Sequence, residues 1–578
     1  MAELPAVPDR RRVLVSGLAS DAHTWNLVFL QLLLEEHGYE VVNLGPCVPD
    51  DVLVTQCLRL RPGLVVLSSV NGHGYQDALR VIPKLRDHPA LAELPMVVGG
   101  KLAVSDEDAS DRAALLAKAG FDAVFPDGGT GLAEFRRYVR SIGPGPAAGG
   151  DFGAFVHTAA RRGHLVVQPR MGFDNPRQMR AGLAATKAAD AATVGTITLD
   201  SYTRVGDLAA VSAALESGTA LNGYPIVSHD PSVTEQVLAG ICDETFPVQV
   251  RHGSAAPAAI FSALTALGLD ATEGGPVSYC LPYGRTPLAE SVRAWAECTA
   301  SFAALRTSGS EPHLETFGGC MMGQLCPPGL LVALSVLEGL FFAQHGMRSI
   351  SLSYAQQTHA KQDAEAVLAL RRLCAELLPE PVAWHIVIYA YMGVYPASRE
   401  GAYRLLRKAA ELAVGTGSER LIVKTVAESR RIPTIEENVA ALEFAAAVAR
   451  RTAPAPTRER GAEADSQTYR EARALIEAVL GLGDDVGQAL LAAFARGYLD
   501  VPYCVHPDNA GAARSYIDAQ GRLRWAQTGS MPLDGLVTVG GEPRRVTSSG
   551  LLSDLSYVRR GYDLYQESAP LSAADPGV

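Results

Sequence analysis

The chain has 578 residues, 48% of them hydrophobic and 20% charged, and its net charge is −11. This length predicts roughly two to four domains, because a single hydrophobic core stops growing near about 250–300 residues. The composition excludes a disordered or collagen-like chain, and an acidic chain without runs of Lys or Arg is not expected to bind nucleic acid.

No segment predicts a membrane span, because the most apolar stretch, 330–343, contains Ser335, Glu338 and Gly339 and is shorter than about 20 residues. The N-terminus has no apolar core before its basic cluster and is not a signal peptide. The 9 cysteines are scattered without a CxxC pair. They predict reduced thiols in a cytoplasmic protein rather than a zinc site or a disulfide framework.

Residues 1–140 predict a small doubly wound α/β domain of the flavodoxin-like or Rossmann-like type. Short apolar runs alternate with helical patterns, as is typical of parallel strands buried on both faces. In the first helical pattern Leu27, Leu30 and Leu34 lie on one stripe. Ligands of such domains bind at the carboxyl ends of the strands. The expected strands are 12–18, 40–45, 64–70, 95–100 and 121–126.

Residues 141–155 are rich in Gly, Pro and Ala and predict a linker. Strand and helix patterns then continue through residues 156–455, where a (β/α)8 TIM barrel is the fold that best fits the length. Residues 456–578 follow a polar break and predict an α+β extension that caps the barrel. Nine apolar segments compete for eight strand positions, so at least one is not a strand: HLVVQP, TVGTITL, YPIVSH, FPVQVRHG, LDATEGG, HLETFGG, SISLSYA, WHIVIYAYM and RLIVKT.

Asp21 and His23 stand two residues apart at the end of the first expected strand. A histidine at such an edge can bind a metal, and Asp21 is a candidate acceptor for its other ring nitrogen. Alternatively, Asp21 caps the following helix and His23 lies on the surface. Small residues follow neighbouring strands, at Ser68 and Gly99-Gly100, and leave a groove in which a large ligand can approach the backbone.

These positions resemble the cobalamin-binding domains of B12-dependent mutases and methyltransferases, whose pattern is Asp-x-His-x-x-Gly, Ser-x-Leu and Gly-Gly. The resemblance implies that His23 binds the cobalt of cobalamin from below and that the nucleotide tail lies along Ser68 and Gly99-Gly100. Asn26 and Val70 depart from the pattern, in place of Gly and Leu, and Asn26 is expected to weaken or rearrange tail binding. The cofactor-binding residues expected in this domain are Asp21, His23, Ser68, Val70, Gly72, Gly99 and Gly100.

Arginines follow three expected strands of the barrel, at Arg170, Arg204 and Arg251. An unpaired buried charge is costly, and a guanidinium binds planar anions with two parallel hydrogen bonds. The three arginines therefore predict a site for carboxylates or phosphates at the carboxyl ends of the strands.

Glu273 follows another strand, with Tyr279 and Tyr283 close enough for one loop to carry all three. The tyrosines could also be wall residues with hydroxyls in water. Lys424 and Glu428 fall on one face if a helix starts there, where they could form an ordinary i,i+4 ion pair.

From about residue 168 to about residue 532 the chain closely resembles the large subunit of glutamate mutase (methylaspartate mutase). The first domain, with SSVNGHG, VVGG and AGFDAVFP, resembles the small subunit. The chain is therefore similar to a fusion of both subunits. The segments that carry the large-subunit resemblance are QPR, DSYTR, LNGYP, QVRHG, EGGPVSYCLPY, ETFGG, YMGVYP, IVKTVAE, DVPY and NAG.

By position, the resemblance implies that Arg170, Arg204 and Arg251 hold the two carboxylates of a small dicarboxylic amino acid. Glu273 would hold its amino group, with Glu273 and Arg204 as catalytic residues, and a carboxylate beside three arginines is expected to stay ionised. The other implied assignments are Tyr279 and Tyr283 to the substrate pocket, and Met392, Lys424 and Glu428 to the cofactor.

The resemblance implies an isomerase that uses adenosylcobalamin and a 5′-deoxyadenosyl radical to interconvert L-glutamate and (2S,3S)-3-methylaspartate. It also implies a homodimer. Tyr389–Val394 replaces His-Gln-Trp-Met-Gly-Gly, and Pro276 replaces a glycine of EGGG, so a related mutase for another amino acid stays open. A cobalamin-binding sensor or carrier without catalysis is the remaining alternative.

Overall fold

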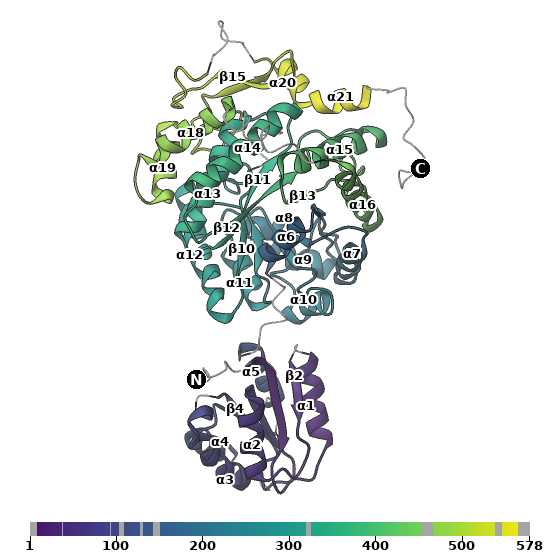
Figure 1. Cartoon of the computed structure of the whole chain (residues 1–578), viewed down its shortest axis with the longest axis vertical. Helices are drawn as coiled ribbons and strands as arrows, with labels where there is room; N and C mark the ends of the chain where they lie inside the picture. Colours follow the sequence, from purple (N-terminus) through teal and green to yellow (C-terminus); the bar gives the residue numbers. More distant parts are fainter. Residues whose placement is uncertain are drawn as a thin grey trace. The chain divides into compact units, whose positions relative to one another are not determined.

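The structure, a computed structural model, divides into two compact units, Met1–Ala147 and Ala148–Val578, and each unit is considered by itself. Figure 1 shows the helices and strands of both units. The residues that the structure describes are 9–36, 39–92, 94–102, 109–127, 131–142, 151–318, 325–453, 466–537 and 546–564.

The first unit contains a five-stranded parallel sheet in the order β2-β1-β3-β4-β5. This is the flavodoxin-like order, which leaves a crevice at the carboxyl ends of β1 and β3. The predicted α/β fold and its five strands are confirmed, with small differences at the strand ends. The strands are β1 (Asp9–Gly17), β2 (Glu40–Asn43), β3 (Pro62–Ser69), β4 (Met96–Gly100) and β5 (Ala123–Pro126).

Helices cover both faces of this sheet. α1 and α5 pack on one face, where Leu27, Leu34 and Phe135 join Val13 and Val15 in a buried cluster. α2, α3 and α4 pack on the other face, against the alternate side chains of β1 and β3. The helices are α1 (Trp25–Glu36), α2 (Asp50–Leu60), α3 (Gly74–Arg86), the 3-10 helix η1 (Pro89–Leu91), α4 (Ala109–Ala119) and α5 (Gly131–Ile142).

The second unit contains an eight-stranded parallel barrel in the order β6-β13-β12-β11-β10-β9-β8-β7. A parallel bridge between Val167 of β6 and Thr193, which precedes β7, joins the two ends of this order. The predicted TIM barrel is therefore confirmed. Its strands are β6 (Val166–Gln168), β7 (Gly195–Thr198), β8 (Val248–Arg251), β9 (Ala271–Glu273), β10 (His313–Glu315), β11 (Ser349–Ala355), β12 (Ala383–Tyr389) and β13 (Arg420–Ile422).

Of the nine segments considered as barrel strands, YPIVSH is the one that is not a strand. Tyr224 makes a single bridge to Leu199, and Pro225 has no N–H with which to continue a ladder. Tyr224 and Ile226 are nevertheless buried. The apolar pattern reflects the burial of a loop, which hydrophobic periodicity alone does not distinguish from a short buried strand.

Helices surround the barrel strands (Figure 1). Residues 143–150 of the expected linker lie outside the described residues, and α6 begins directly after Asp151, whose carboxylate accepts the N–H of Ala154. The ring of Phe152 in α6 lies 4.9 Å from the guanidinium of Arg420. The helices are α6 (Phe152–Arg161), α7 (Pro176–Ala188), α8 (Ser201–Val205), α9 (Leu208–Ser217), α10 (Pro231–Leu238), α11 (Ala258–Ala266), α12 (Leu288–Ala303), the 3-10 helix η3 (Ala304–Ser308), α13 (Pro328–Gln344), α14 (Ala360–Leu377), α15 (Arg399–Thr416) and α16 (Ile435–Arg451).

The C-terminal extension packs on loops at the carboxyl ends of the barrel strands. Just after β11, the Thr358 hydroxyl donates to the Gly521 carbonyl at 2.7 Å. In the segment after β9, the N–H of Leu288 donates to Asp508 at 2.7 Å. The elements of the extension are α18 (Gln467–Leu480), α19 (Val486–Arg496), β14 (Arg514–Ile517), β15 (Leu523–Gln527), α20 (Ser548–Leu555) and α21 (Tyr557–Leu564).

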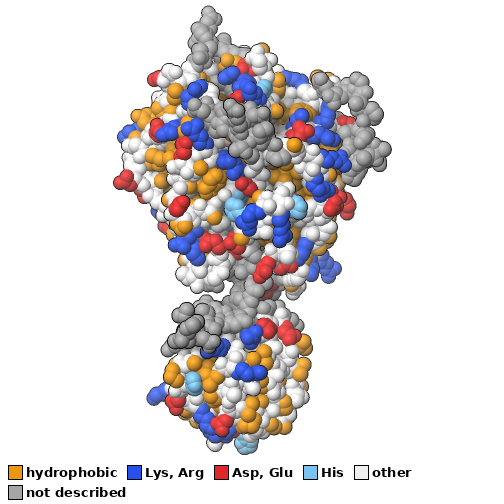
Figure 2. Space-filling model, viewed as in Figure 1, with side chains coloured by type: hydrophobic (Ala, Val, Ile, Leu, Met, Phe, Trp, Pro, Cys, Tyr) orange, Lys and Arg blue, Asp and Glu red, His pale blue; other side chains and the backbone are white. Residues whose placement is uncertain are grey.

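Within the described ranges, no helix combines the length and hydropathy that crossing a membrane requires. On the face shown in Figure 2, acidic and basic side chains are interspersed on each of the two units.

Candidate functional site

Asp21 and His23 follow β1 and contact each other. His23 Nδ1 lies 2.7 Å from Asp21 Oδ1, and the backbone N–H of His23 donates to the same oxygen at 2.9 Å. The other carboxylate oxygen accepts the N–H of Val70 at 2.5 Å. Asp21 thereby links the loop after β1 to the loop after β3. The Asp21 side chain is buried, whereas 49% of the His23 side chain is exposed.

The Asp21 carboxylate favours one tautomer of His23. Burial opposes the charge of Asp21, but hydrogen bonds from the backbone N–H groups of His23 and Val70 outweigh it and lower the pKa of the carboxyl. An ionised Asp21 places the imidazole proton on Nδ1, so Nε2 keeps the lone pair that a metal needs. Helix α1 begins only at Trp25, and the Asp21 carboxylate is engaged by His23 and Val70. Asp21 therefore orients His23 and does not cap this helix.

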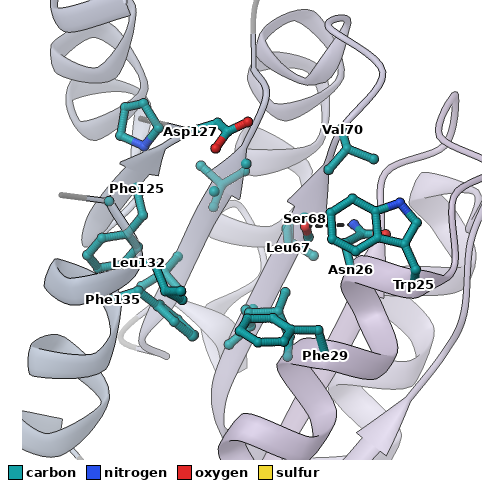
Figure 3. Close-up of a pocket in the computed structure, with 18 residues that line it drawn as sticks. Trp25, Asn26, Phe29, Leu67, Ser68, Val70, Phe125, Asp127, Leu132 and Phe135 are labelled. Atoms are coloured by element: carbon teal, nitrogen blue, oxygen red, sulfur yellow. Dashed lines mark hydrogen bonds between the residues drawn. The ribbon is translucent and has the colours of Figure 1, made fainter. Parts of the chain in front are cut away.

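A cavity of about 500 Å³ opens between α1, α5 and the carboxyl ends of β3, β4 and β5 (Figure 3). Its walls are mainly apolar, with Trp25 and Phe29 on α1, and Phe125 and Phe135 on the side of β5 and α5. A concave, largely apolar cavity with a few polar groups is typical of a small-molecule site. Of the predicted cofactor residues, those that line it are Ser68, Val70, Gly99 and Gly100.

Glycines let the backbone form one wall of this cavity. A Cβ atom at Gly99 would lie 2.8 Å from the carbonyl oxygen of Phe125. Gly100 has a φ of +96°, and a Cβ atom there would overlap the carbonyl oxygen of Ser69. Gly72, in contrast, does not line the cavity. Its N–H donates to the Lys101 carbonyl at 3.2 Å.

Asn26, which departs from the cobalamin-binding pattern, lines the same cavity. Its amide nitrogen donates to the Ser68 hydroxyl oxygen at 2.9 Å (Figure 3). Asn26 Oδ1 is buried and has no hydrogen-bond partner among the described residues. Because Ser68 accepts from Asn26, its own hydroxyl hydrogen is left to donate to a bound molecule. The Asn26 side chain thus occupies a wall of the cavity without closing it.

In the barrel, Arg251, Glu273 and Tyr389 end β8, β9 and β12, and their side chains meet. Arg251 Nη2 lies 2.8 Å from Glu273 Oε2, and both side chains are buried. The Tyr389 hydroxyl lies 3.2 Å from the same oxygen, while the Tyr279 hydroxyl donates to Glu273 Oε1. The Arg251 guanidinium lies 5.1 Å from the centre of the Tyr389 ring. The result is a buried ion pair that accepts a hydrogen bond from Tyr279 and lies beside the Tyr389 hydroxyl.

Glu315 and Arg420 form a second buried ion pair beside the first. Glu315 ends β10 and is the register neighbour of Glu273 on β9. The Tyr389 hydroxyl donates to Glu315 and so links the two carboxylates. Sequence reasoning did not single out Glu315, Arg420 or Tyr389 for this site. The available signal was a charged residue on an expected strand, Glu315 in HLETFGG and Arg420 in RLIVKT.

The two neighbouring carboxyls titrate differently. Burial raises the pKa of Glu273, Arg251 partly offsets that rise, and Glu315 adds to it. Burial alone would raise the pKa of Glu315 as well, but Arg420 and Arg251 outweigh it and lower that pKa. The expectation that three arginines surround Glu273 is wrong in this structure. Among the described ion pairs, Arg251 is the arginine that contacts Glu273, and burial dominates.

Arg170 lies in a separate cluster with Met392, Lys424 and Glu428. Glu428 Oε2 lies 3.4 Å from Lys424 Nζ and 3.9 Å from Arg170 Nη1. Arg170 Nη1 also lies 3.7 Å from the Met392 sulfur. No helix starts at Lys424, because residues 426–430 form a turn and α16 begins later, yet the turn still brings Lys424 and Glu428 together.

Arg204, on the short helix α8, has other partners. Its Nε donates to the His252 carbonyl at 3.2 Å, and its guanidinium lies 5.6 Å from the centre of the Tyr283 ring. The rings of Tyr283 and Tyr279 are 5.8 Å apart. Burial and the nearby Arg204 lower the pKa of His252 to about 3, so this imidazole is neutral. Arg204 thus joins the aromatic wall formed by the two predicted tyrosines.

Comparison with known families separates the chain into two parts. Residues 147–542 match the methylaspartate mutase E chain (MutE) family, which covers more than half of the chain. The chain belongs to the methylaspartate mutase E chain family. Residues 11–136 match the B12 binding domain family. The predicted fusion of a cobalamin-binding domain with a glutamate mutase-like barrel is therefore confirmed.

Individual relatives agree with this assignment. The glutamate mutase epsilon subunit of Halobacterium salinarum is 30% identical over 345 residues, covering 58% of this chain and 72% of the relative. That of Yersinia enterocolitica is 31% identical over 350 residues, covering 58% and 72%. A solved cobalamin-binding protein from Desulfitobacterium hafniense DCB-2 aligns with 23% of this chain and 59% of its own at 20% identity and a TM-score of 0.19, which supports no argument.

The residues of the first unit fit a cobalamin. The cavity and its glycine wall provide room for a bulky tail, and His23 presents a nitrogen oriented by a carboxylate. In the described part of the chain, no group of three or more His, Cys, Asp or Glu side chains is arranged to hold a metal ion. A cobalamin needs no such group, because its corrin ring already binds the cobalt and the protein adds at most one ligand.

Proposed function

We propose that this chain is an adenosylcobalamin-dependent mutase that interconverts L-glutamate and (2S,3S)-3-methylaspartate. When bound, adenosylcobalamin supplies the radical chemistry that rearranges the carbon skeleton. The first unit would hold the cofactor through His23 and the cavity beside it, and the barrel would hold the amino acid.

The observation that carries the proposal is the buried Arg251–Glu273 pair at the carboxyl ends of β8 and β9. An α-amino acid carries a carboxylate and an ammonium group, and this pair offers one complementary group to each. Substrate binding would exchange the internal ion pair for two ion pairs with the ligand, which leaves neither buried charge unpaired. A ligand that lacked the amino group would leave Glu273 without a cation.

The second carboxylate of the substrate would be held by Arg170 or Arg204, which follow neighbouring strands. Tyr279 and Tyr283 would enclose the substrate together with Phe317, whose ring centre lies 4.9 Å from that of Tyr279. An aromatic enclosure excludes water and other molecules, which limits side reactions of reactive intermediates. Lys424 and Glu428 would contact the ribose of the cofactor, and Met392 would lie near them.

The direct test uses the purified full chain with adenosylcobalamin and ¹³C-labelled L-glutamate. We expect ¹³C NMR to show methylaspartate, and Arg251→Ala to abolish its formation. If the carbon skeleton of glutamate stays unchanged, a panel of other amino acids tests the related-mutase alternative. Cobalamin binding without turnover of any amino acid would favour the sensor or carrier. Homodimer formation is part of the proposal, and light scattering of the purified chain tests it.

A further inference from the structure

Helix α13 contains one ionisable side chain, Glu338, in the sequence PGLLVALSVLEGLFFAQ. Every residue of this helix from Pro328 to Gly339 is buried, and Glu338 is 0% exposed. An isolated carboxyl group in an apolar interior is costly unless hydrogen bonds compensate it. Glu338 is therefore expected to form hydrogen bonds with a specific partner in the fold.

That partner is the segment that follows Glu273. Glu338 Oε1 accepts the backbone N–H of Val277 at 3.0 Å and that of Ser278 at 2.9 Å. A Cβ atom on Gly275 would overlap the Glu338 carboxyl group, so the chain passes this group closely. The segment is thus folded around the Glu338 carboxyl.

The same segment brings Tyr279 back onto Glu273. The two residues are six apart, and the Tyr279 hydroxyl donates to Glu273 Oε1. Gly274 has a φ of +128° and lies against the Tyr279 ring, which makes this a sharply reversed and densely packed turn. If Glu338 were apolar, the N–H groups of Val277 and Ser278 would lose their acceptor in a buried place, and the turn would have to change.

We infer that Glu338 is a positioning residue for the substrate site, which holds residues 274–279 in the conformation that places Tyr279 on Glu273. This inference rests on the proposed function only in taking Glu273 as the ligand of the substrate amino group. Glu338 acts through hydrogen bonds to the loop and does not itself contact the substrate.

The required property of Glu338 is an acceptor oxygen at Oε1, not a charge. Burial raises the pKa of Glu338 to about 7, so its neutral form is readily populated near neutrality. Glutamine keeps an acceptor oxygen in a side chain of the same shape, whereas leucine keeps most of the volume and removes the acceptor. Glu338→Gln is therefore expected to preserve the loop that Glu338→Leu disturbs.

The test measures amide hydrogen exchange of a peptide covering 274–283, and kcat and KM for glutamate, in the full chain with adenosylcobalamin. For Glu338→Leu we expect the exchange rate of that peptide to rise at least tenfold and KM to rise at least tenfold. We expect kcat to change much less. Glu338→Gln should stay within about threefold of wild type. Glu471→Leu is the matched control, because Glu471 is a buried helical glutamate whose partners are Gln467 and Trp525.

The inference is overturned if Glu338→Leu leaves both the loop exchange and KM unchanged, or if Glu338→Gln is as impaired as Glu338→Leu. If Glu338→Leu does not fold, Gly275→Ala tests the same contact from the loop side, and unchanged exchange and KM in that variant also overturn it. A wild-type chain that does not rearrange glutamate contradicts the proposed function. The exchange measurement still decides whether Glu338 holds the loop.

Discussion

Replacing Asp21 by Asn tests how the protein orients His23. Aspartate and asparagine have the same shape but differ in their hydrogen-bonding groups. Asp21 accepts from His23 Nδ1 at 2.7 Å and from the Val70 N–H at 2.5 Å. Asparagine has one oxygen and can satisfy only one of these donors. If its NH₂ group faces His23, the imidazole must accept at Nδ1. The proton then moves to Nε2, where it removes the lone pair that would bind cobalt.

Loss of such a supporting carboxylate typically weakens metal binding about 10- to 100-fold, which is roughly 1.4–2.7 kcal/mol. We expect the Kd of the full chain for cobalamin to rise by this factor in titrations followed by visible absorption, with less of the histidine-coordinated spectrum. Asp77→Asn is the matched control, because Asp77 bonds Ser20 and Arg80 at the same edge. An Asp21→Asn variant that binds cobalamin as tightly as wild type would refute the role given to Asp21.

Three further predictions concern the barrel and the sheet. Arg251→Ala should lower the free energy of unfolding by about 3–5 kcal/mol in denaturant titrations, because it leaves Glu273 buried without its cation, and adding Glu273→Gln should restore part of the loss. Gly100→Ala should lower the free energy of unfolding of the first unit by about 1–3 kcal/mol and reduce cobalamin binding, because the added Cβ would overlap β3. Gly45 has a similar φ but open space around it, so Gly45→Ala should keep cobalamin binding. Burial raises the pKa of Asp363 in the folded chain to about 7. The protonated side chain therefore contributes fully to stability below the pKa that it has in the unfolded chain, and this contribution is lost as the pH rises towards 7. The stability of Asp363→Asn relative to wild type should therefore rise by roughly 2–3 kcal/mol between pH 5 and pH 8, and a pH-independent difference would contradict this.

Features that depend on neighbouring residues could be predicted well from the sequence. The run LVVLSSV predicts a strand at 64–70, and β3 spans Pro62–Ser69. Asp21 and His23 are two residues apart, so a turn of the chain is enough to bring the carboxylate to the imidazole. Such contacts need little information about the rest of the fold. The YPIVSH segment shows the limit of the same reasoning, because burial alone does not distinguish a loop from a strand.

Contacts across the barrel could not be predicted in this way. The positions of three arginines at strand ends predict that they lie near one glutamate, but the strand order and register decide which groups meet. Arg251 contacts Glu273, Arg170 contacts Glu428, and Arg204 reaches Tyr283. Tyr389 lies 116 positions from Glu273 in the chain, and only closure of the barrel brings its hydroxyl there. No local pattern encodes such a distance.

Linear order therefore accounts for the alternation of strands and helices, the junction between two units and the aspartate–histidine contact, since each arises from spacing within a few residues. The tertiary structure accounts for the rest. It decides which carboxylates share a buried site, which of them has a raised pKa and which a lowered one, and why an apolar helix carries Glu338. Burial and the closeness of opposite charges set those properties, and both depend on segments that meet only when the barrel closes.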